Sequence, residues 1–137
     1  MYTINFWPIL VAAVVAFGIG ALWYSPVLFG KEWMSLSKIN ESDMEDAKRR
    51  GMWKSYLTQF IASLVSFSVL GFLISSSAIM SATDGAFLAL IVWLGFVATD
   101  AVGALLWEQK PFKLVLINSI GTLVSLVIGG AIIGAWR

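Results

Sequence analysis

Three polar side chains in the apolar stretches of this sequence are of types that could do chemistry inside a membrane. Asp100 is the only ionisable residue deep within an apolar run, Asn118 follows at a similar depth in the next run, and Gln59 lies in an earlier one. A charged side chain at such a depth costs about 2.5–3.5 kcal/mol on insertion scales, so it normally faces a partner or water. These three residues form the candidate intramembrane site.

Two interpretations of Asp100 stay open. In the first, the carboxyl group is a proton or cation site, and Asn118 and Gln59 are neutral dipoles around it. In the second, it is a protonated or hydrogen-bonded clasp between helices, in which each bond contributes about 1 kcal/mol.

Glu108 and Trp107 are secondary candidates at the edge of the same run. Glu108 stands beside Lys110 near the interface, where a charge is tolerated. We expect it to be solvated or paired locally, with Lys31 or Arg50 as other partners. The tryptophans, Trp107 included, are expected to be interfacial anchors, because indole rings favour the headgroup level of a membrane.

The absence of cysteine and histidine excludes several classes of site. Zinc, haem and iron–sulfur centres lose their usual ligands, and nucleophile–histidine systems lose their base. The sequence also has no phosphate-cradling glycine loop and no basic–aromatic strip for nucleic acid. The one deep carboxyl group has no second titratable group at its depth. We therefore expect no metal, no cofactor, no nucleic-acid partner and no enzyme activity.

Composition and hydropathy predict an all-α integral membrane protein. Of the 137 residues 59% are hydrophobic and only 12% charged, whereas a soluble domain carries about a quarter charged residues. Four apolar runs have about the 20 residues that a helix needs to cross a bilayer. We predict a bundle of four transmembrane helices in one domain, residues 1–137, with spans at residues 4–24, 56–80, 84–107 and 112–136.

Residues 31–54 form the one substantial polar segment, predicted to be an amphipathic connector on the membrane surface. Ser42 and Glu45 match a capping box, acids precede bases as the helix dipole favours, and Gly51 is a natural stop. This pattern predicts a short helix over residues 43–50.

The distribution of lysine and arginine predicts the orientation. Eight bases fall in the loop at residues 25–55 and in the turn between the third and fourth runs, against Arg137 alone on the other side. The positive-inside rule then places both loops in the cytoplasm and both termini outside it. We expect a multi-pass protein of a cell inner membrane.

The second and fourth runs resemble each other when they are shifted by 59 residues. The shift pairs Gln59 with Asn118 and Ser66 with Ser125, and in each run the amide and the serine share a helical face. We predict that a helical hairpin is duplicated as a parallel repeat, with Ser66 and Ser125 as secondary site residues. Asp100 falls opposite Phe17, so the carboxyl group itself is not duplicated.

Two aromatic and proline-containing blocks resemble a known family. The segment Trp23–Met34 (WYSPVLFGKEWM) is similar to one signature of the family catalogued as domain of unknown function 1761. Residues 93–96 (WLGF) and 106–111 (LWEQKP), with Asn118 after them, resemble its second block. The likeness covers nearly the full length. It implies a four-helix bacterial membrane protein and supplies no activity, ligand or catalytic residue.

Two classes of function remain. The first is translocation of a small solute or ion, linked to protons, by a homo-oligomer, since small-residue stripes on all four spans favour lateral association. Two similar hairpins could also rock about a shared axis. The alternative is a non-catalytic accessory or structural membrane protein that binds a partner protein or lipid.

Overall fold

A computed structural model describes residues 5–136 of the chain and contains four helices long and apolar enough to cross a membrane. The prediction of an all-α bundle with four spans is confirmed. The helices are α1 (Phe6–Trp23), α2 (Gly30–Leu36), α3 (Glu41–Arg50), α4 (Trp53–Ser76), α5 (Ala82–Val92), the π-helix η1 (Trp93–Ala98), α6 (Thr99–Leu106) and α7 (Phe112–Ala135). The segments α5, η1 and α6 form one continuous span.

The observed spans begin and end within a few residues of the predicted ones. The largest shift is in α4, expected at residues 56–80 and found at Trp53–Ser76. It ends early because the chain turns at Ala78, which has a positive φ of 57°. The predicted start of the first span at Ile4, and Arg137 in the charge comparison, lie outside the described residues.

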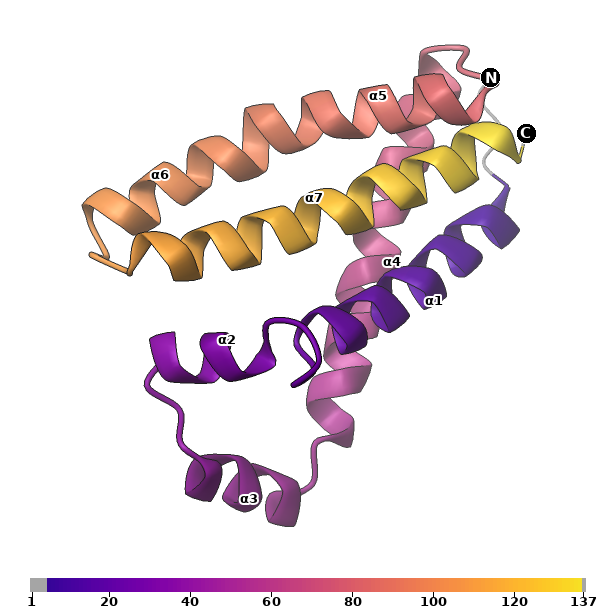
Figure 1. The fold of residues 1–137 in the computed structure, drawn as a ribbon. Helices are drawn as coiled ribbons and strands as arrows, with labels where there is room; N and C mark the ends of the chain where they lie inside the picture. Colours follow the sequence, from indigo (N-terminus) through magenta and orange to yellow (C-terminus); the bar gives the residue numbers. More distant parts are fainter. Residues whose placement is uncertain (1–4, 137) are drawn as a thin grey trace.

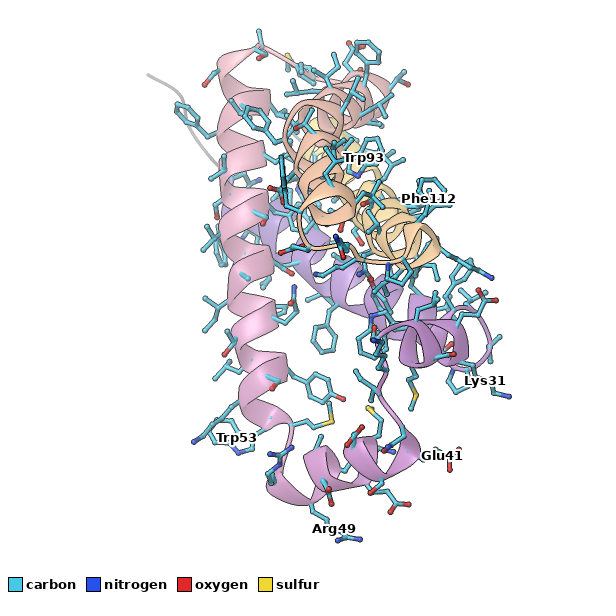
Figure 2. All side chains as sticks on the ribbon, turned by 90° about the vertical axis from the view of Figure 1, so that its left-hand side faces the viewer. Lys31, Glu41, Arg49, Trp53, Trp93 and Phe112 are labelled. Carbon is cyan, nitrogen blue, oxygen red and sulfur yellow. The ribbon has the colours of Figure 1, made fainter. Side chains whose placement is uncertain are left out.

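Helix α7 lies at the centre of the bundle. The span α5–η1–α6 runs antiparallel beside it, and α1 packs along another side (Figure 1). Helix α4 crosses behind α1 and α7, and its first half extends away from them toward α3 (Figures 1 and 2). We call the end with both termini the terminal end. The opposite end, where residues 24–52 and 107–111 connect the spans, is the connector end.

The apolar core lies toward the terminal end, where all four spans meet. Its fully buried members are Ile9, Ala12, Ala13, Phe67, Leu70, Ile74, Ala89 and Ile133. Glycines bring α5 and α7 together there: a Cβ added to Gly130 would stand 2.5 Å from the carbonyl oxygen of Gly85. Small residues allow such close backbone approach, and packing at this range drives helix association in lipid.

The connector contains two helices, of which the sequence predicted one. Helix α3 was expected over residues 43–50, begins two residues earlier and has no buried residue. The predicted capping pair Ser42 and Glu45 is wrong. Asn40 caps the helix instead, because its Oδ1 accepts from the Asp43 amide at 2.8 Å while Asp43 accepts from the Asn40 amide. Gly51 ends the helix as predicted, with φ +84°.

The two hairpins are packed differently. The span α5–η1–α6 follows α7 closely, whereas α1 and α4 cross and then separate toward the connector end (Figure 1). The first hairpin, whose helices α1 and α4 separate toward the connector end, also has the longer connector. The duplication of a hairpin stays a prediction.

Candidate functional site: a polar cavity between α6 and α7

A cavity of about 170 Å³ between α6 and α7 contains two of the three predicted site residues. Asp100, in the first turn of α6, lines it together with Asn118 of α7. The remaining lining residues are Val97, Ala101, Ala104, Lys110, Val115, Ser119 and Thr122. The site therefore combines a carboxyl group with an amide, two hydroxyls and one ammonium group near the connector end.

Gln59 does not line this cavity. It lies on the exposed side of α4, in a separate surface depression. The reason is the course of α4, whose first half diverges from α6 and α7 (Figure 1). Of the secondary candidates, Ser66 is exposed on α4, Ser125 is half-buried on α7, and Trp107 is 85% exposed at the end of α6. None of the three lines the cavity.

The end of α1 is hydrogen-bonded to α7 beside the cavity. The indole N–H of Trp23 donates to the carbonyl oxygen of Ile117 at 3.0 Å. The hydroxyl of Tyr24 donates to Oδ1 of Asn118 at 2.8 Å. Because Oδ1 is engaged by Tyr24, the cavity-lining amide of Asn118 has its two N–H donors left to offer.

A third hydrogen bond joins Ser119, the next residue of α7, to the span that contains Asp100. The indole N–H of Trp93, the first residue of η1, donates to the carbonyl oxygen of Ser119 at 2.8 Å. We call residues 117–119 the acceptor segment. The wide turn of η1 directly precedes Asp100, and the hydroxyl of Thr99 donates to Gly95 within it at 2.8 Å. Such π-turns occur frequently at functional sites.

Trp23, Tyr24 and Trp93 are the site-forming residues that sequence reasoning missed. The expectation that the tryptophans are mostly interfacial anchors stays a prediction, and the indole N–H groups of Trp23 and Trp93 donate to backbone carbonyls of α7. A signal was present: Trp93 stands well within an apolar run, where a buried indole N–H needs an acceptor.

Two ion pairs lie around the start of α7. Lys110 pairs with Glu108 at 3.5 Å, so Glu108 is locally paired, but not with Lys31 or Arg50, the partners suggested from the sequence. Lys113, at the start of α7, pairs with Glu32 of α2 at 2.8 Å. Both pairs are largely exposed and contribute little to stability. Asp100 makes no hydrogen bond and no ion pair with any described residue.

Comparison with known proteins places the chain in a family. A family model described as "Protein of unknown function (DUF1761)" matches residues 7–134. The chain belongs to the DUF1761 family. The resemblance noted from the aromatic and proline blocks is thereby confirmed. No curated protein and no solved structure matches this DUF1761 chain. Its function must therefore be argued from its own residues.

Gly121 tests the bond that ties α1 to the acceptor segment. A Cβ at this position would stand 2.8 Å from Nε1 of Trp23, so Gly121→Ala must displace the indole from the carbonyl of Ile117. We expect a loss of about 1–3 kcal/mol, the usual cost of overpacking, measured as thermal unfolding in detergent. Gly18→Ala is the matched control, because nothing lies within 4 Å of its added Cβ. If Gly121→Ala and Gly18→Ala were equally stable, the hydrogen bond between Trp23 and Ile117 would not stabilise the contact of α1 with α7.

Proposed function

We propose that this protein translocates a small solute or ion across a bacterial inner membrane, in a proton-linked way, with Asp100 as the residue that binds the proton or cation. The observation that carries the proposal is the Asp100 carboxyl group, which lines a polar cavity inside a membrane span and has no partner among the described residues. A carboxyl group at that depth needs water, a ligand or a partner. The absence of a protein partner counts against the structural clasp.

The composition of the cavity fits an exchange of protons or cations. Asn118 offers N–H donors, and Ser119 and Thr122 add hydroxyls next to the carboxyl group. The Lys110 ammonium, held 3.5 Å from Glu108, lines the cavity from the connector side. The proposal gives these residues binding roles and assigns no catalytic activity to the chain. The lining is thinner than the sequence predicted, since Gln59 lies outside it.

Proton flux tests the role of Asp100. In proteoliposomes with an internal pH-sensitive dye, the wild-type protein should relax an imposed pH gradient, and Asp100→Asn should reduce the flux to that of protein-free liposomes. Asp84→Asn removes an exposed carboxyl group at the start of α5 and should leave the flux unchanged.

The thermal stability of the Asp100 variants completes the test. Because Asp100 has no partner among the described residues of its own chain, Asp100→Asn and Asp100→Leu should unfold at the wild-type temperature. Wild-type flux in Asp100→Asn would end the transport proposal. A large loss of stability in Asp100→Leu alone would favour the clasp and, with it, an accessory protein that binds a partner protein or lipid.

The proposal includes an orientation with both termini extracytoplasmic. Six of the eight bases counted above lie in the connector of the first hairpin and two follow α6, both at the connector end (Figure 1). The chain has no cysteine, so single cysteines report topology cleanly. In intact cells an impermeant maleimide should label Ala82→Cys and spare Ser42→Cys, both of which are exposed positions. The reverse pattern would invert the orientation.

We further propose that the protein acts as a homo-oligomer. On the outer face of the third span, Gly95 and Gly103 have open space around them, with nothing within 4 Å of an added Cβ. Thr99 stands between them at four-residue spacing, and small residues in this spacing favour helix association in lipid. Asp100 lies beside this face, so a second copy would cover the exposed side of the site.

Disulfide crosslinking tests this contact. Thr99→Cys, in an otherwise cysteine-free chain, should form a covalent dimer on oxidation in native membranes. Ile61→Cys, an exposed position on α4, should stay monomeric. If Thr99→Cys gave only monomer on oxidation, association through the third span would be ruled out.

A further inference from the structure

A second polar surface lies on α4, at the end that follows the connector. It is a depression of about 410 Å³ lined by Lys54, Ser55, Thr58, Gln59 and Ala62. All five residues come from α4, whose first half is separated from α6 and α7 (Figure 1). The depression therefore faces the surroundings of the protein and shares no lining residue with the Asp100 cavity.

The depression contains one ammonium group, which only donates, beside hydroxyl and amide groups, which both donate and accept hydrogen bonds. No carboxylate of the described residues pairs with Lys54, whereas Lys110 and Lys113 both have one. Ser55 and Gln59 make no side-chain hydrogen bond within the described chain, and the Thr58 hydroxyl donates to the backbone of Lys54 at 2.7 Å. Polar groups left unpaired in hydrocarbon are destabilising. A ligand rich in acceptor oxygens would satisfy them.

These donors are arranged by depth along the helix. Trp53 begins α4, as expected at headgroup level, and the Lys54 ammonium lies 5.6 Å from the centre of its ring. With a rise of 1.5 Å per residue, Gln59 lies about 7.5 Å deeper than Lys54. Further along the helix come Ala62 and then the exposed apolar Val65 and Val69. This order, cation, hydroxyl, amide and hydrocarbon, matches the phosphate, ester and acyl regions of a phospholipid.

We propose that this depression binds one anionic phospholipid. The phosphodiester lies against Lys54 and Ser55, an ester carbonyl accepts from the Gln59 amide, and an acyl chain follows α4 past Ala62. Lys48 and Arg50, which end α3 just before α4 and form no ion pair with a described residue, strengthen the preference for an anionic headgroup, since juxtamembrane lysines and arginines attract anionic lipid. A second copy of this face is a poor occupant, because it would bring two Lys54 ammonium groups together.

Native mass spectrometry of the purified protein tests the site. We expect one tightly held phosphatidylglycerol per protomer and weaker binding of phosphatidylcholine with the same acyl chains. Lys54→Gln should weaken phosphatidylglycerol binding about fivefold, the effect of one basic residue at an anionic surface, and Lys54→Arg should restore it. Gln59→Leu should weaken the binding of both lipids, since both have the ester groups that the amide would contact.

The matched control is Lys31→Gln, which removes the same charge from α2. Lys31 and Trp53 lie on opposite sides of the molecule (Figure 2), so this variant should bind as the wild type does. The proposed site would be wrong if Lys31→Gln and Lys54→Gln lost the same amount of phosphatidylglycerol binding. It would also be wrong if the protein bound the two lipids with equal affinity. Displacement of the lipid by millimolar inorganic phosphate would assign the site to a soluble anion. A Gln59→Cys disulfide dimer in native membranes would assign it to a second copy.

Discussion

The connector end of this bundle depends on three hydrogen bonds that converge on the acceptor segment of α7. Trp23 and Tyr24 donate to Ile117 and Asn118, and Trp93 donates to Ser119. A carbonyl oxygen has two lone pairs, so a helical carbonyl can accept a side-chain bond besides its own backbone bond. The first and third spans are thereby tied to adjacent residues of the fourth, and the cavity at Asp100 lies beside these ties.

The two ends of the bundle are held by different forces. Toward the terminal end, glycines such as Gly85 and Gly130 let α5 and α7 approach closely, and aliphatic side chains of all four spans fill the core. Toward the connector end α4 leaves the bundle, and indole and phenol donors tie the first and third spans to α7 beside its buried residues Leu114, Val115 and Ile117. The polar lining of the cavity lies at this end.

The separation of α4 also divides the polar residues into two surfaces with opposite chemistry. The cavity at Asp100 contains a carboxyl group and suits a proton or a cation. The depression at Lys54 contains donors and suits an anionic headgroup. In the sequence these surfaces look like one group at one depth, because Gln59 and Asn118 occupy matching positions along their helices.

The sequence by itself determined the number and approximate bounds of the membrane spans and the all-helical class of the fold. The long apolar runs must be helices, because a helix satisfies its own backbone hydrogen bonds in lipid. Gly51 ends α3 through a local property, its ability to adopt a positive φ. Of the candidate site, the depth of Asp100 and Asn118 was predictable, because depth depends only on position along a helix.

Only the tertiary structure decided which residues meet. Whether Gln59 faces Asp100 depends on how α4 is tilted and rotated, and packing against the other helices sets both. The partners of Trp23 and Trp93 depend on contacts between distant segments, and the π-turn of η1 sets the direction of the residues that follow it. The cap of α3 at Asn40 instead of Ser42 was a choice between two local patterns.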